Sequence, residues 1–212
     1  DVEYVTLPAI VPNADICDKA VDLTPYFGQV AGVVQTTPSY NNTTATASPY
    51  DPAVDCWEEG AGSNPDKVDK SMWFTFVGDG KRYYIETDSC STKFIKDGDT
   101  QMAIFEGPDC LNLSGPVVCN DDIDFLSNNL RSGVDIETVA GKTYFILVDG
   151  YNLGGNVATG EFCLRISQAP SITCAQGAVG DYTLNNIGAV CFGTNLTDVL
   201  EVDAAGFVIP NA

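Results

Sequence analysis

The sequence predicts an all-β protein whose main domain is an antiparallel sandwich. Several short runs alternate apolar and polar residues with a period of two, and glycine, proline and asparagine separate them, as in strands joined by turns. No segment keeps the apolar period of a helix over several turns. Hydrophobic residues make up 44% of the 212 residues and aromatic residues 10%, so the chain can bury a packed core.

The N-terminal part of the chain holds few predicted strands. Residues 1–27 contain an extended lead-in and a short turn, and residues 28–37 alternate as a strand does. Residues 38–70 are rich in proline, asparagine, threonine, serine and glycine, which is typical of surface loops. We therefore expect a long loop here, anchored by Cys56.

The central part contains the sharpest strand patterns. Residues 71–89 hold two alternating runs around Gly78-Asp79-Gly80, which predicts a β-hairpin. Residues 100–107 and 115–120 predict two more strands, and residues 133–151 predict a strand–turn–strand unit. These segments supply most of the expected sandwich.

Residues 160–168 predict the last strand of the sandwich. Phe162, Leu164 and Ile166 fall on one face of this strand, and the other positions of the run fall on the opposite face. This alternation is typical of a half-buried antiparallel strand.

The composition changes after this strand. The remaining segment begins at a proline junction, contains few aromatic residues and carries its own cysteine pair. It is too short to bury a core unaided. We therefore expect a sandwich domain over residues 1–168 and a partial second β module over residues 169–212, which packs on the first domain or is completed from outside the chain.

Charge and histidine content exclude several classes of function. The chain has 10 basic and 29 acidic residues, a formal net charge of −19, so neither nucleic acid nor an anionic membrane surface is an expected partner. The absence of histidine excludes Ser-His-Asp and Cys-His catalysis and histidine-bound zinc or iron. The longest strongly apolar run, residues 144–148, is too short to span a bilayer.

Eight cysteines indicate four disulfides and an oxidising, extracellular environment. They form an even set without a CxxC pair, whereas zinc sites usually contain closely spaced ligand pairs. The count leaves about 105 pairings open. The N-terminus has neither a basic n-region nor an apolar h-region, so we expect a mature secreted chain whose export signal has been removed.

Several motifs in a set order resemble the bacterial pre-peptidase C-terminal (PPC) domain family. They are "SMWFTF" from Ser71, "GDTQMAIFEGPDC" from Gly98, "CNDD" from Cys119, and "VAGKTYFILVDGY" from Val139 followed by "GEFCLRI". The N-terminal "ADICDKAVDL" is similar to the family's opening Asn-Asp-x-Cys, with Ala14 in place of the asparagine. The resemblance covers roughly residues 13–168 and points to the cysteine-containing variety in secreted surface proteins of Bacteroidetes-type bacteria.

This resemblance implies a jelly-roll-like β-sandwich related to CUB-type modules, a non-catalytic part appended to secreted proteases and adhesins. It implies a calcium site formed by Asp99, Asn120, Asp121 and Asp122. The sequence departs from the family pattern at Gly98, where an aromatic residue is common, and in the length of its polar loop.

The resemblance also suggests how the cysteines pair. One bridge ties the lead-in to the long loop, one closes a short connection, one lies within the sandwich and one staples the tail. In that order, the bridges are Cys17–Cys56, Cys110–Cys119, Cys90–Cys163 and Cys174–Cys191.

The residues taken alone leave the calcium site open. Calcium prefers six to eight hard oxygens, and residues 120–122 supply carboxylates on one turn while Asp99 begins a strand that can neighbour it. Asp15, close to Cys17, is a further candidate ligand, whereas we expect Asp124 to face solvent. Asparagine and aspartate also form turns, so a hydrated turn is the alternative, and no EF-hand spacing is present.

Aromatic residues in loops are the candidates for ligand binding. Trp57, followed by Glu58 and Glu59 and near Tyr50, fits a sugar platform with an acid; the alternative is that Trp57 anchors its loop on the sandwich. Tyr151 lies in a glycine-rich loop after a strand. Nothing in the sequence marks a carboxylate for a raised pKa, so we do not expect an enzyme.

Together these observations predict a non-catalytic, secreted or cell-surface module that calcium stabilises and that works in adhesion or as a building block of an extracellular filament. Its partners are expected to be copies of itself, neighbouring modules or a surface glycan. A partial second module leaves strand edges to which a neighbour's strand can add. The alternative is an accessory carbohydrate- or protein-binding domain of a secreted hydrolase.

Overall fold

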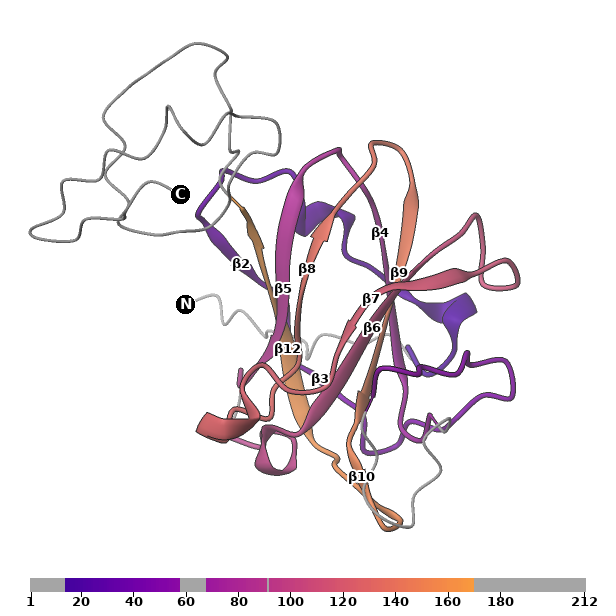
Figure 1. The fold of residues 1–212 in the computed structure, drawn as a ribbon, viewed down its shortest axis with the longest axis vertical. Coiled ribbons are helices and arrows are strands. Elements are labelled where there is room, and N and C mark those ends of the chain that lie inside the picture. Colours follow the sequence, from indigo (N-terminus) through magenta and orange to yellow (C-terminus); the bar gives the residue numbers. More distant parts are fainter. Residues whose placement is uncertain (1–13, 58–67, 91, 170–212) are drawn as a thin grey trace, which may run out of the picture. The chain divides into compact units, whose positions relative to one another are not determined.

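The computed structural model describes residues 14–57, 68–90 and 92–169 (Figure 1). The chain divides into two compact units, residues 1–170 and 171–212, and the second lies wholly outside the described residues. The predicted partial module therefore lies outside the described residues, except for Ala169, and so does the predicted Cys174–Cys191 disulfide.

Two five-stranded sheets form the described unit, which confirms the predicted all-β sandwich. The first sheet has the order β1-β4-β9-β6-β7, with β1 parallel to β4 and all other neighbours antiparallel. Its strands are β1 (Val21–Asp22), β4 (Met72–Val77), β9 (Thr143–Gly150), β6 (Thr100–Glu106) and β7 (Ser114–Asn120).

The second sheet has the order β2-β12-β5-β8, and the short β3 also pairs with β12. Its strands are β2 (Val34–Thr36), β12 (Glu161–Gln168), β5 (Arg82–Asp88), β8 (Gly133–Glu137) and β3 (Tyr40–Asn41), and a separate small ribbon consists of β10 (Asn152–Leu153) and β11 (Asn156–Val157).

Helical structure in the described ranges is confined to single 3-10 turns. No helix of this part of the chain is long and apolar enough to cross a membrane. The turns are η1 (Cys17–Lys19), η2 (Thr24–Tyr26), η3 (Lys96–Gly98) and η4 (Phe125–Ser127).

The predicted hairpin around Gly78-Asp79-Gly80 is wrong, although both of its strands exist. Strand β4 lies in the first sheet and β5 in the second, so the turn crosses between the sheets. The same holds for β8 and β9, whose connection runs beside the first crossing: the Gly78 N–H donates to the Lys142 carbonyl and the Gly141 N–H to the Gly78 carbonyl, both at 2.8 Å. An alternating pattern defines a strand and its buried face but leaves the partner strand open.

Strands β6 and β7, which follow each other in the chain, pair as a hairpin within the first sheet. Their antiparallel register aligns Met102 with Asn120 and Ile104 with Val118. The start of β6 therefore lies beside the end of β7, and the residues just outside these two strand ends are brought together.

The main core fills the space between the sheets. The inward faces of β4, β5, β6, β8, β9 and β12 supply it, and the predicted inward face of the last strand is confirmed because Phe162, Leu164 and Ile166 are fully buried there. Strands β4, β6 and β9 are buried on both faces, so a second layer must cover the first sheet from outside.

The long polar loop provides this outer cover. Trp57, with Val54 and Val68, packs on the outward side chains of the first sheet, among them Trp73 and Phe105. The indole N–H of Trp57 donates to the Met102 carbonyl at 3.2 Å. The predicted surface loop thus carries its own small apolar cluster, as segments packed under long loops often do.

The disulfides of the described residues differ from the expected set in two bridges. Cys17 pairs with Cys110 and Cys56 with Cys119, so the expected Cys17–Cys56 and Cys110–Cys119 bridges are wrong. Cys17, Cys110 and Cys119 all lie against the outer apolar cluster, so the lead-in and the long loop are each tied to the hairpin that they cover. The expected Cys90–Cys163 bridge is confirmed.

Candidate metal centre

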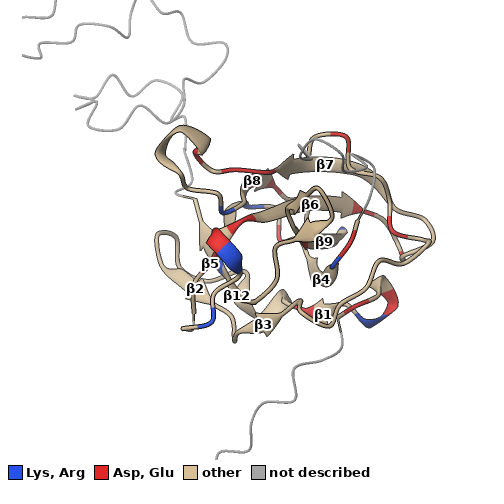
Figure 2. Cartoon of the chain, turned by 90° about the horizontal axis from the view of Figure 1, so that it is seen from below, with Lys and Arg blue, Asp and Glu red and all other residues tan. Residues whose placement is uncertain are grey.

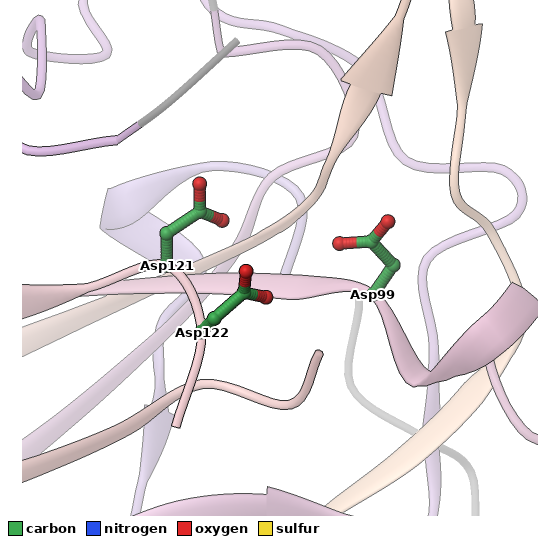
Figure 3. A group of neighbouring side chains, drawn as sticks. All are labelled: Asp99, Asp121 and Asp122. Atoms are coloured by element: carbon green, nitrogen blue, oxygen red, sulfur yellow. The ribbon is translucent and has the colours of Figure 1, made fainter. Parts of the chain in front are cut away.

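Three carboxylates converge at one end of the β6–β7 hairpin. Asp99 directly precedes β6, whereas Asp121 and Asp122 directly follow β7. Because the strands are antiparallel, these positions meet, and one carboxylate oxygen of each residue lies within 4.8 Å of the others. Figure 3 shows the three side chains facing a common space. Three of the five predicted metal ligands are therefore brought together.

The electrostatics of this group favour a bound cation. Burial and, after it, the negative charges of Asp121, Asp122 and Asp97 together raise the pKa of Asp99 to about 7, while Lys96 opposes them. A divalent cation among the three carboxylates would reverse this effect, because it stabilises the ionised form of each one. No sequence signal marks this raised pKa, because it depends on burial and on carboxylates from two separate segments.

Asn120 braces the loop that carries two of the carboxylates. Its amide oxygen accepts the N–H of Gly133 at 3.0 Å, and its amide nitrogen donates to the carbonyl of Asp122 at 3.0 Å. The first bond connects the end of β7 to the start of β8, and the second ties Asn120 to the residue two positions further along the loop. Asn120 therefore orients the loop, and its role as a ligand stays a prediction.

Asp15 lies outside the group of three carboxylates. Its two oxygens accept the N–H and the hydroxyl of Thr46, and so it joins the lead-in to the long loop. The inclusion of Asp15 among the metal ligands is wrong.

Asp124 has a local structural role. One of its oxygens accepts the N–H of Ser127 at 3.2 Å, and the other accepts the hydroxyl of the same residue at 2.6 Å. These hydrogen bonds lower the pKa of the Asp124 carboxyl, which is exposed as predicted but caps η4.

The predicted aromatic ligand-binding residues are dispersed. Trp57 is buried in the outer cluster and is not accessible to a ligand, so the alternative role as a loop anchor is correct. Tyr50 is 82% exposed. The N–H of Tyr151 donates to the carbonyl of Asp99 at 3.2 Å, which places the Tyr151 backbone beside Asp99. Glu58 and Glu59 lie outside the described residues.

A fourth carboxylate, Asp149 at the end of β9, is fully buried, and the sequence reasoning missed it. It accepts the N–H groups of Asp69, Lys70 and Gly150 at 2.6–2.7 Å and thereby fixes the end of the long loop. Burial raises its pKa to about 7, although the three backbone donors lower it. The available signal was an aspartate that ends a run of five apolar and aromatic residues in an otherwise buried strand.

We expect stability without calcium to decrease as pH rises from about 4 to about 7. The folded pKa of Asp149, about 7, lies above the unfolded value of about 3.9, so the protonated form stabilises the fold below pH 4 and this contribution is lost through pH 7. Urea unfolding of wild type and Asp149→Asn in chelator measures the effect. The variant should reduce the decrease by on the order of 2 kcal/mol.

Asp99 contributes with the same sign, so Asp149→Asn should reduce the slope without abolishing it. Carboxyls with a lowered pKa, such as Asp79, make the fold more stable as pH rises. They do so equally in wild type and variant, so their contribution cancels when the two slopes are compared. Identical slopes in wild type and variant would show that Asp149 is ionised in the fold throughout this range.

The fold and this site define a disulfide-braced β-sandwich with a candidate cation centre at one end. No family model matches the chain, and no curated protein matches it. Among solved structures, the chain is similar to PliG of Aeromonas hydrophila, a periplasmic lysozyme inhibitor of g-type lysozyme. The identity is 13% over 70% of this chain and 95% of PliG, with a TM-score of 0.36.

Proposed function

We propose that this chain is a non-catalytic, calcium-stabilised β-sandwich module of an extracellular protein, which works in adhesion or as a building block of a filament. The observation that carries the proposal is the convergence of Asp99, Asp121 and Asp122. The PPC resemblance of the same motifs supports it.

The chemistry of the site suits calcium better than other common metals. All candidate ligands are hard oxygens from carboxylates, and calcium accepts six to eight such ligands in flexible geometries that carbonyls and water can complete. Zinc and iron favour nitrogen and sulfur, yet the chain has no histidine and the six cysteines of the described unit form disulfides. The bracing by Asn120 holds two ligands in place before the ion binds.

The disulfides support an extracellular location. Such bridges persist in oxidising compartments and are rare in the cytosol. Figure 2 shows acidic residues on many strands and loops and fewer basic ones, and the net charge of −19 suits a surface that contacts salt-rich medium and divalent cations.

The raised pKa of Asp99 also suits a catalytic acid, so the two roles must be weighed. Asp149, the other carboxyl with a pKa near 7, is buried and bonded to backbone N–H groups, so a substrate cannot reach it. Asp99 faces two further carboxylates, whereas a glycosidase places its two acids on opposite sides of the scissile bond. We therefore favour cation binding over catalysis.

Calcium is expected to raise the thermal midpoint of the full chain. At a concentration about 100 times the Kd, binding to the folded state adds about 2.7 kcal/mol, or a shift of roughly 5–10 °C. Differential scanning calorimetry in chelator and in calcium measures it, and isothermal titration gives the Kd, for which extracellular modules have about 10⁻⁴–10⁻³ M.

Two variants separate the cation site from a general salt effect. Asp99→Asn removes a carboxylate from the group and should abolish most of the shift, while Asp15→Asn removes an exposed carboxylate outside the group and should leave it intact. Equal shifts in both variants, or no shift and no heat in the wild type, would contradict the calcium site.

The alternative is an accessory binding domain of a secreted hydrolase, favoured by the exposed ring of Tyr50, which can stack on a sugar or contact a protein. Electron microscopy of native material separates the roles. Filaments support the building-block function, whereas single particles attached to a catalytic domain support the accessory one.

A further inference from the structure

Two large apolar side chains are exposed to solvent at the tip of one loop. Phe125 and Leu126 are 71% and 95% exposed, whereas the large aromatic side chains of the strands fill the cores. They lie in η4, between β7 and β8, and we call them the Phe125–Leu126 tip. In Figure 1, η4 is the short coil at the lower left end of the sandwich.

Hydrogen bonds hold the loop beneath the tip in one conformation. The Ile123 N–H donates to the Arg131 carbonyl at 2.7 Å, and Asp124 and Asn129 exchange backbone hydrogen bonds of 3.2 and 2.9 Å. Asn128 adopts the left-handed conformation that ends η4, and Asp124 caps its start. The tip is therefore presented in a fixed geometry, and little conformational freedom is lost when a partner covers it.

The base of the loop is fixed to the second sheet. The Arg131 guanidinium donates to the Asp88 carboxylate of β5 at 2.6 Å and to the Asn129 side chain at 3.0 Å. Arg165 of β12 also pairs with Asp88, at 3.4 Å. These ion pairs fix the base of the loop to β5 and, through Asp88, to β12.

Negative charge lies beside the tip. Phe125 lines the same small depression as Asp121 and Asp122, together with Cys56 and Cys119. Asp124 sits beside the tip in the chain, and Arg131, the nearest cation in the sequence, is already paired with Asp88. A surface that covers Phe125 and Leu126 must meet these carboxylates at its rim.

We propose that the Phe125–Leu126 tip is the contact centre for a protein partner that presents an apolar depression rimmed by Lys and Arg. In protein interfaces, apolar side chains at the centre usually supply the affinity. Opposite charges at the rim steer the two partners together. At this tip a second copy of the chain fits poorly, because each copy has only 10 basic residues against 29 acidic ones to supply the Lys and Arg of the rim. Anionic lipid headgroups are repelled by the same carboxylates.

This inference deepens the proposed function as a binding module. Calcium would neutralise part of the charge of Asp121 and Asp122, so the inference is tested without the cation. The test is selection of random short peptides, displayed on phage, against the immobilised full chain in chelator. Peptides that also bind Phe125→Ser/Leu126→Ser are removed, and the remaining peptides are synthesised for Kd measurement. A matched control, Val30→Ser/Leu153→Ser, replaces two exposed apolar residues outside this loop.

The expected result is a set of peptides that combine Lys or Arg with aromatic or aliphatic residues. They should bind the tip variant about tenfold or more weakly and the control variant as tightly as wild type. Both variants should retain the wild-type thermal midpoint, because the replaced side chains are exposed.

Four outcomes would overturn the proposal: no peptide that depends on the tip, tip-dependent peptides without Lys or Arg, tip-dependent binding to phosphatidylcholine–phosphatidylserine vesicles, or tip-dependent dimerisation in sedimentation. The failure of this inference is distinguishable from failure of the calcium proposal. The calcium-induced thermal shift of Phe125→Ser/Leu126→Ser measures the cation site separately. The calcium proposal itself is tested by Asp99→Asn.

Discussion

Replacement of Trp57 by alanine is expected to lower the free energy of unfolding by about 3–5 kcal/mol. The indole is only 5% exposed, packs on the outer face of the first sheet, and donates a hydrogen bond to the Met102 carbonyl. Its removal leaves a cavity between the long loop and the sheet, and a buried carbonyl loses its side-chain donor. Urea unfolding of the full chain measures the loss.

Tyr50→Ala is the matched control in the same loop. Its ring is 82% exposed, so the free energy of unfolding should change by about 0.5 kcal/mol or less. If Trp57→Ala were as stable as Tyr50→Ala, the outer cluster would not hold the loop. Trp57 would then return as a candidate ligand-binding residue.

Trp57 also illustrates why sequence predicted the strands better than their covering. Alternation along β12 identified the inward face correctly, because that strand is buried mainly on one side. Strand β9 instead shows continuous burial, which requires apolar partners on both faces. The run Tyr144–Val148 carried that signal, and the loop with Trp57 supplies the second partner.

The crossings between sheets were not predictable from local pattern. Gly78 and Gly141 mark turns, and turn residues are compatible with a hairpin and with a passage between layers. The choice depends on which strands fill the core together: Phe76 and Tyr83, on either side of the turn, both contact the main core from opposite sheets. Which strands fill the core together depends on the whole chain and cannot be read from the turn alone.

The sequence predicted the type of the candidate site, a group of carboxylates, better than it predicted which residues belong to it. Asp99, Asp121 and Asp122 flank two strands that are consecutive in the chain and pair as neighbours, so their meeting follows from one hairpin. The prediction for Asp15 required the lead-in to contact the hairpin end, and the actual partner of Asp15 is Thr46. Long-range contacts of this kind are fixed by packing of the outer cover and leave no local sequence signal.

The strongest effect on stability is expected from the disulfide that ties the lead-in to the hairpin. Cys17 and Cys110 are 93 residues apart, and a loop of this length confines the unfolded chain by about 4–5 kcal/mol. The double replacement Cys17→Ser/Cys110→Ser should lower the free energy of unfolding by up to this amount, as measured by urea unfolding under oxidising conditions. The other bridges already restrict the unfolded chain, which makes this figure an upper bound.

The single replacement Cys110→Ser tests the pairing itself, because it frees the thiol of whichever cysteine was bonded to it. The structure predicts alkylation at Cys17, whereas the family-type pairing predicts alkylation at Cys119. Peptide mass mapping after alkylation of the folded variant reads this directly. Labelling at Cys119 would mean that the bridge closes the hairpin connection locally, and the covalent tie between lead-in and hairpin would be lost. Labelling at Cys17 would establish that a covalent bond secures the lead-in to the hairpin that positions the carboxylates.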